Sequence, residues 1–376
     1  MGTLALSGEQ VRLLRLRAQR LDPRWADAAG AAEVVRQLGG VHAQLPSASA
    51  LALRPRSRGL RDDDVERARV SARTLVRTWA MRGTFHLLAT EDVGWLLPLL
   101  APGLIAGGAR RRAQLGLDED TVARALRVIR QALAGSAPLT RAELAERLAA
   151  RGVDPAGQRI AHLVHRAGLE GLVCHGPDRG REPTFVLLAD WVAPGRPLER
   201  EAALGEVARR YLAAYGPADP RDLAAWSGLP LRDARAAWRL VAGELAEVRV
   251  DGAAAWLPAA RLAWAAGPPD RRRRPLVHLL AGFDGYLLGY RSRELAVPAA
   301  HARRVWTGGG FIKPTLAVDG RVAGVWSSAT RGGRLRLTVA PFMELDAEVA
   351  AGVAAEAADV GRFLGSEVAL TVTEPG

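Results

Sequence analysis

The spacing of apolar residues near the start of the chain predicts three helices followed by a β-hairpin. Apolar side chains recur at helical intervals in residues 7–21, 31–38 and 62–72. Two runs rich in β-forming residues, 75–81 and 84–88, then flank a short turn. Three helices followed by a hairpin are the layout of a winged helix-turn-helix unit, which usually binds DNA.

The same order of elements occurs twice more along the chain. Helices are expected at 119–133, 141–150, 155–169, 198–215, 220–226 and 231–240. A strand pair follows each set of helices, and the last of these pairs closes on an Asp-Gly turn at Asp251. The Pro-x-Thr-x-x-Glu pattern that begins at Pro138 recurs as Pro-x-Asp-x-x-Asp from Pro217, which marks an internal repeat.

The pattern changes to strands after the arginine run 271–274. Apolar and polar positions in 315–326 predict a hairpin, strict alternation in 334–339 predicts a further strand, and a helix and a last strand close the chain. The predicted fold class is therefore α+β, with three tandem winged helix-turn-helix units and a small C-terminal β-barrel-like unit. The expected boundaries are 1–106 for the first unit with a connecting helix, 115–195 for the second, 196–266 for the third and 275–376 for the C-terminal unit.

Composition and charge narrow the class of protein. The chain has 376 residues and a single cysteine, Cys174, which excludes an internal disulfide and a cysteine metal cluster. No run of about 18 apolar residues and no apolar signal segment is visible, so we expect a cytoplasmic, nucleoid-associated protein with no membrane partner. The net charge of +12 creates a positive field that favours DNA; the alternative is a basic composition inherited from a GC-rich genome.

Two long polar side chains, His42 and Gln44, lie two residues apart in an apolar and glycine-rich segment. In an extended backbone, residues at this spacing point to the same side, so both could hold a water or a polar ligand between them. The alternative is that they form the solvent-facing side of a short segment after a helix. The local sequence alone favours this second explanation.

Four segments in a fixed order carry more information than any one of them. They are Gly40-Val41-His42-Ala43-Gln44, Arg77 to Leu87, Phe283 to Tyr290, and Lys313 to Trp326. Together they resemble the AlkZ/YcaQ family of bacterial winged-helix DNA glycosylases, over nearly the whole chain. The resemblance implies three winged helices and a β-barrel around a concave basic surface. It also implies excision of bulky N7-alkylguanines, in some members including interstrand crosslinks, often as self-resistance to DNA-alkylating natural products.

The resemblance assigns the catalytic role to His42 and Gln44. The family motif is Gln-x-Gln in one branch and Gln-x-Asp in the other, so His42 stands where both have glutamine. An N7-alkylated guanine already carries positive charge and leaves readily, so the enzyme has to place a water near C1′. Gln44 can orient that water and a neutral His42 can accept its proton, so activity should fall on the acid side of the His42 pKa.

The expected partner is double-stranded DNA carrying bulky alkyl adducts, bound by a monomer without metal or cofactor. The alternative is a non-catalytic winged-helix DNA-binding protein or transcriptional regulator, which would usually be a symmetric dimer with a sequence-specific site. The residues expected to contact DNA are Arg54, Arg56, Arg58, Arg82, Arg179, Arg181, Gly309, Arg331 and Arg334.

Other polar residues have simpler explanations than a role in chemistry. His162, His165 and His175 lack the carboxylate or cysteine partners that would complete a metal site. Asp284 is expected to cap a turn, the alternative being a second carboxylate for the cationic lesion. Lys313 is the only lysine and is expected to be structural, which predicts a monofunctional enzyme without the amine nucleophile of strand-nicking glycosylases.

Overall fold

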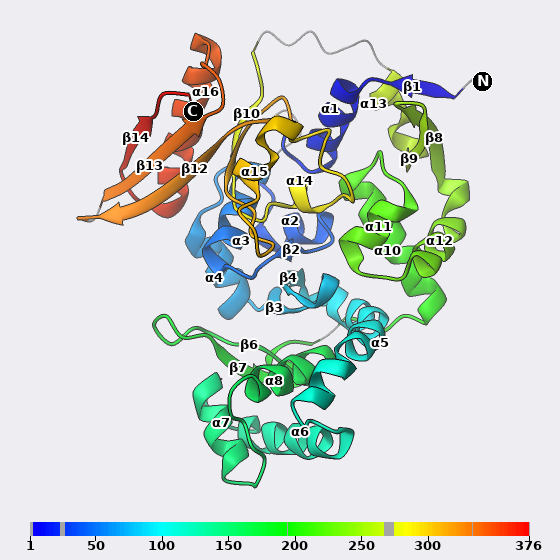
Figure 1. The fold of residues 1–376 in the computed structure, drawn as a ribbon, viewed down its shortest axis with the longest axis vertical. Coiled ribbons are helices and arrows are strands. Elements are labelled where there is room, and N and C mark those ends of the chain that lie inside the picture. The colour runs from blue at the N-terminus through cyan, green and yellow to red at the C-terminus, as the bar shows by residue number, and fades with distance from the viewer. Residues whose placement is uncertain (1–2, 23–26, 194, 267–273, 333, 376) are drawn as a thin grey trace.

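The computed structural model describes residues 3–22, 27–193, 195–266, 274–332 and 334–375. They form an α+β fold with a central sheet, and a C-terminal sheet stands at one side (Figure 1). Three sets of helices, each followed by a pair of strands, make up most of the chain before residue 267, and each set with its strand pair is called a helix–hairpin unit below. The predicted fold class is confirmed at this level. Most of the arginine run 271–274 lies outside the described residues.

The first helix–hairpin unit carries the candidate catalytic pair. Its elements are α2 (Ala31–Gln37), β2 (Val41–His42), α3 (Pro46–Leu53), α4 (Asp62–Val70), β3 (Leu75–Trp79) and β4 (Phe85–Ala89). Helix α3 was not expected, because its sequence is apolar on all sides and shows no helical periodicity. Pro46 at its first position is the signal that could have revealed it.

The second unit forms the lower lobe in Figure 1 and shares a sheet with the first. Its elements are α6 (Glu119–Leu133), β5 (Leu139–Thr140), α7 (Arg141–Ala149), α8 (Arg159–Leu169), β6 (Val173–His175), β7 (Thr184–Leu187) and α9 (Leu188–Trp191). Thr140 and Glu143 form the capping box that the sequence predicted for α7. The six strands are ordered β2-β4-β3-β6-β7-β5, and β3 meets β6 where Arg77 pairs with His175.

The third unit includes the start of the chain. Its elements are α10 (Arg200–Tyr215), α11 (Pro220–Ser227), α12 (Leu231–Leu240), β8 (Leu245–Val250), β9 (Ala253–Pro258) and α13 (Leu262–Ala266). Strand β1 (Leu4–Leu6) pairs in parallel with β8, and α1 (Gly8–Ala18) buries Val11 and Leu14 against Val248. The first helix of the chain therefore packs on the third unit, although the first unit follows it in sequence. Strand β1 brings it there by covering an edge of β8 that would otherwise be open.

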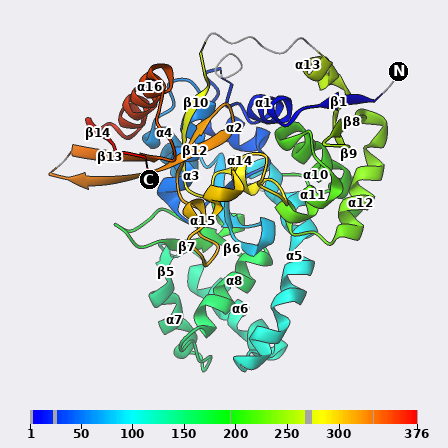
Figure 2. The same ribbon diagram turned by 45° about the horizontal axis from the view of Figure 1, so that its top comes forward.

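The C-terminal part is an open sheet backed by a helix. Its elements are β10 (Val277–Leu280), α14 (Gly285–Leu288), α15 (Ala302–Val305), β11 (Thr315–Val318), β12 (Arg321–Arg331), β13 (Arg334–Pro341), α16 (Ala347–Leu364) and β14 (Val368–Val372). The order β10-β11-β12-β13-β14 leaves β10 and β14 as edges, so the described strands form no closed barrel and that expectation is corrected (Figure 2). Helix α16 packs Val349, Val353 and Val360 against the sheet, and a sheet whose apolar face is covered by a helix does not have to close on itself.

Helix α5 (Thr90–Gln114) joins the first and second units. Its length and composition would suit a membrane span, and 44% of its apolar window is buried inside the protein. Val93, Leu96 and Leu100 lie in a core cluster that also contains Tyr211 of α10. We therefore interpret α5 as a core helix.

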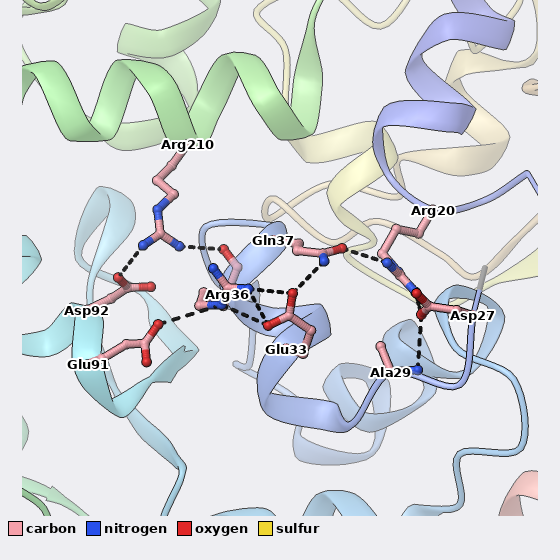
Figure 3. Close-up of polar contacts among 9 residues, drawn as sticks. All are labelled: Arg20, Asp27, Ala29, Glu33, Arg36, Gln37, Glu91, Asp92 and Arg210. Atoms are coloured by element: carbon pink, nitrogen blue, oxygen red, sulfur yellow. Dashed lines mark hydrogen bonds and ion pairs between the residues drawn. The ribbon is translucent and has the colours of Figure 1, made fainter. Parts of the chain in front are cut away.

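A polar network holds α2, the helix that leads into β2 (Figure 3). Arg210 of α10 donates to the carbonyl oxygen of Arg36 over 3.1 Å and pairs with Asp92 of α5 over 3.2 Å. On the other side, Gln37 accepts a hydrogen bond of 2.7 Å from Arg20. Helix α2 is thus tied both to the third unit and to the N-terminal segment, which fixes where β2 begins.

Candidate active site

The backbone before the candidate catalytic pair requires glycine. Gly40 has a φ of +117°, a region that L side chains rarely adopt. A Cβ at this position would lie 2.8 Å from Met81 Cε and 2.9 Å from Leu88 Cδ2. The chain can therefore turn out of α2 into β2 only with glycine here, and this turn delivers His42 to the central sheet.

Strand β2 places His42 directly opposite His86 of β4. The next residue, Ala43, donates its N–H to the carbonyl oxygen of Phe85 over 2.7 Å. The carbonyl oxygen of Ala43 accepts a hydrogen bond of 3.0 Å from Arg77 Nε. Gln44 follows in a bend just before α3, and its side chain is exposed. The expected extended backbone thus ends at Ala43, and hydrogen bonds on both sides fix its position.

Stacking holds the imidazole of His42. The ring stacks on Phe283 with centroids 4.8 Å apart and planes at 24°, and it meets His86 edge-on at 5.4 Å. Its Nδ1 atom is buried and makes no hydrogen bond within the described part of the chain. His86 is buried, and its Nδ1 lies 3.0 Å from the carbonyl oxygen of Thr84, the geometry of an N–H donor. Neither Phe283 nor His86 was predicted as a site residue, although both lie in the segments that carry the family resemblance.

The site keeps both histidines neutral. Burial, and secondarily the positive charge of Arg82, lower the pKa of His42 from 6.5 to about 4. Burial and the neighbouring His42 hold the pKa of His86 well below its usual range. At physiological pH the imidazole of His42 is therefore uncharged and can accept a proton.

Excision should be independent of pH near neutrality and should fall as the pH drops through the His42 pKa of about 4. Protonation below that value removes the proton acceptor. Single-turnover rates across the acid range, corrected for uncatalysed acid depurination, measure this fall, which is the acid limb of the pH–rate profile. In Arg82→Met the limb should move to higher pH, because one of the two causes of the low pKa is removed. A limb near 6.5 in the unmodified protein would contradict the buried environment of His42.

Arg82, which was expected to contact DNA, also makes internal contacts that the sequence did not predict. Its NH1 group donates to the carbonyl oxygens of Trp226 over 2.7 Å and Ala225 over 3.2 Å, near the end of α11. Its backbone lies in the left-handed region, with a φ of +56°. Arg82 therefore joins the hairpin of the first unit to the third unit, while its charge acts on His42.

Two further arginines expected to contact DNA are buried. Arg54 and Arg56 have side chains 1% exposed. Arg54 pairs with Glu356 at 2.7 Å and with Asp359 at 2.6 Å, and Arg56 pairs with Asp284 at 2.6 Å. The prediction that they contact DNA is wrong, because both guanidinium groups are enclosed and neutralised by carboxylates of the C-terminal part. The segment expected to be a basic loop is a 3₁₀ turn, Arg54–Arg56, that continues α3.

The other residues expected to contact DNA lie at the surface. The exposed ones are Arg58, Arg179, Arg181, Gly309 and Arg334. Arg179 pairs with Glu143 at 2.7 Å and Arg334 lies 3.6 Å from Glu367. The side chain of Arg331 lies outside the described residues. These positions remain predictions.

Two of the remaining polar candidates, His175 and Asp284, make structural contacts. His175 is buried among Phe85, Trp79 and Phe185, and no group of histidine, cysteine and acidic residues within the described ranges is placed to hold a metal. Asp284 caps the short helix α14, as predicted, by accepting from the N–H of Tyr286 over 2.8 Å. Its pairing with Arg56 was not visible in the sequence.

Repeated sets of helices followed by hairpins, on a chain with a net charge of +12, favour a protein that acts on DNA. The family of AlkZ-like DNA glycosylases matches residues 35–363, and the chain belongs to this family. It is 32% identical to an interstrand DNA cross-link repair glycosylase of Streptomyces sahachiroi, over 96% of this chain and 97% of that protein. The structure of the Streptomyces sahachiroi DNA glycosylase AlkZ is similar with a TM-score of 0.83 at 30% identity, covering 98% of this chain and all of that one. The chain is therefore an enzyme that hydrolyses N-glycosyl bonds in DNA.

Proposed function

We propose that this enzyme excises bulky N7-alkylated purines from double-stranded DNA, including bases joined in interstrand crosslinks. The observation that carries the proposal is the neutral imidazole of His42, held by stacking beside the exposed Gln44. A neutral group suits a leaving base that is itself cationic, since a protonated one would repel it. The name of the Streptomyces sahachiroi relative supports activity on crosslinks.

The chemistry is a hydrolysis in which each residue has a separate task. The bond between C1′ and the purine N9 breaks, and its electron pair neutralises the positive charge of the N7-alkylated base, so the base leaves uncharged. Water adds to C1′ and releases its proton to His42, while the amide of Gln44 orients that water. No metal or cofactor is needed, because the alkyl group has already activated the leaving base.

The helix–hairpin units supply the binding surface in this proposal. We infer that they act as winged helices, and that the exposed Arg58, Arg179, Arg181 and Arg334 reach the DNA backbone. Such contacts are independent of base sequence and weaken steeply with salt.

We further propose a monomer that works in the bacterial cytoplasm on the nucleoid and protects its host against a DNA-alkylating natural product. Because the chain belongs to a family of DNA glycosylases, the alternative of a non-catalytic regulator is set aside.

Release of free base from a defined duplex tests the substrate. The protein is incubated with DNA that carries one N7-alkylguanine, and abasic sites are detected by cleavage with alkali. We expect free alkylguanine and an abasic site in equal amounts. Tight binding without release of any base from N7-alkylated or crosslinked duplexes would contradict the proposal.

We expect the enzyme to be monofunctional, leaving the abasic strand intact. Lys313 is the only lysine of the chain, it is half-buried, and its backbone N–H donates to the carbonyl oxygen of Val305 over 3.1 Å. Borohydride added during turnover should trap no protein–DNA complex, because no imine forms at C1′. A strand-nicking glycosylase treated in parallel serves as the positive control. A covalent complex that disappears in Lys313→Arg would show that the lysine is a nucleophile.

A further inference from the structure

Three aromatic rings lie in a row from the catalytic pair to the protein surface. His42 stacks on Phe283, and Phe283 meets Phe311 edge-on with centroids 5.1 Å apart and planes at 84°. Phe311 is 39% exposed, so part of its apolar ring is in contact with solvent. The row therefore joins the site of water attack to an apolar ring that faces solvent.

The middle ring is held rigidly. Phe283 has a φ of +58°, a strained conformation for a residue with a side chain. The next residue, Asp284, is fully buried and accepts hydrogen bonds from both terminal nitrogens of Arg56, at 2.6 and 2.9 Å. On the other side, a Cβ at Gly282 would come within 3.2 Å of the carbonyl oxygen of Ile312, so the two loops touch backbone to backbone. The surroundings of Phe283 thus impose its strained backbone, which is a feature of preorganised sites.

The outer ring stands on a glycine turn. Gly308, Gly309 and Gly310 all have positive φ, and a Cβ on any of them would meet nothing within 4 Å. The Phe311 N–H donates to the carbonyl oxygen of Gly308 over 3.1 Å, and a β-bridge between Trp306 and Ile312 closes the turn. The turn is therefore open around the glycines but fixed at its base, next to Phe283.

We propose that Phe283 and Phe311 bind a planar aromatic group carried on N7 of the lesion, and so determine which adducts the enzyme prefers. This inference rests on the proposed function. An aromatic ring stacks favourably on an exposed phenyl ring, and it removes apolar surface of Phe311 from water. A methyl group on N7 is too short to span the row from His42 to Phe311. The ring pair therefore distinguishes a bulky aromatic adduct from a small one, whereas His42 and Gln44 serve both.

The ratio of kcat/KM for two duplexes tests this role. One duplex carries a guanine with a naphthylmethyl group on N7, and the other carries N7-methylguanine. In Phe311→Ala the naphthylmethyl-to-methyl ratio should fall about tenfold, which corresponds to one stacking contact of about 1.4 kcal/mol. Phe311→Trp should keep the ratio, since it keeps a ring. Met343→Ala, which truncates a side chain that is 63% exposed in another part of the chain, should not change it.

Each other result decides against the inference or against the proposed function. An unchanged ratio in Phe311→Ala, or an equal loss in Phe311→Trp, overturns the role of the ring. Unmodified protein that releases N7-methylguanine but shows no preference for the naphthylmethyl adduct overturns the inference alone. Unmodified protein that releases neither base overturns the proposed function.

Discussion

His42→Ala is expected to lower the single-turnover rate of base excision by about 10²- to 10⁴-fold, the usual contribution of a positioned general base. The ring is uncharged because burial and Arg82 hold its pKa at about 4, and it lies on the strand that leads to Gln44. Gln44→Ala should cause a loss of similar size, because the attacking water then loses its orientation. DNA binding at equilibrium should change little in either variant, since neither side chain is expected to contact phosphates.

Two further variants separate a proton acceptor from a group that only positions water. His42→Gln restores the Gln-x-Gln pattern of the family and should keep part of the activity, but its acid limb should disappear because glutamine does not titrate. His301→Ala is the matched control, since that ring stacks on Phe342 and not on a residue of the catalytic pair. Excision at the normal rate by His42→Ala would remove the catalytic role altogether.

Arg56→Met is expected to lower the free energy of unfolding by about 3–5 kcal/mol, the cost of leaving a buried carboxylate without its partner. The pair that Arg56 forms with Asp284 is enclosed, with side chains 1% and 0% exposed. It joins the end of α3 to the loop that carries Phe283, so the variant should also lower the excision rate. Urea denaturation monitored by circular dichroism gives the stability, and excision assays below the transition give the activity.

A surface pair provides the control for this loss. Arg209 pairs with Glu244 at 2.7 Å with both side chains about half exposed, so Arg209→Met should change stability by less than about 1 kcal/mol. The double variant Arg56→Met, Asp284→Leu should recover much of the lost stability, because no charge then remains buried alone. A loss for Arg56→Met as small as that for Arg209→Met would show that the buried pair does not hold the two parts together.

Local rules explain what could be predicted from the sequence. The capping box at Thr140 and the hairpin at Asp251 follow from interactions within a few residues, and the structure contains both. Helix α3 was missed because its apolar sequence is compatible with a buried strand or a buried helix. The expected barrel was wrong for a different reason: alternation identifies strands, but the burial of one face by α16 decides whether their sheet closes.

The candidate site also has features that the sequence showed and features that only the structure shows. The two-residue spacing of His42 and Gln44, the glycines before them and the family resemblance were all visible in the sequence. The low pKa of His42 was not, because it depends on burial by residues distant in sequence, Phe283 among them, and on the charge of Arg82. Arg54 and Arg56 were taken for DNA contacts because a sequence shows charge but not the carboxylates that neutralise it.

The sequence by itself determined the order of the helices and hairpins, the basic character of the chain and the family, and it named His42 and Gln44 as the candidate catalytic pair. These properties depend on residue type and on spacing over short stretches. Only the tertiary structure decided that the first helix packs on the third unit, that Arg82 joins two units, and that the Phe283 loop meets β2. Such contacts join residues up to about 240 positions apart, and burial and ion pairing at that separation leave no periodic signal in the sequence.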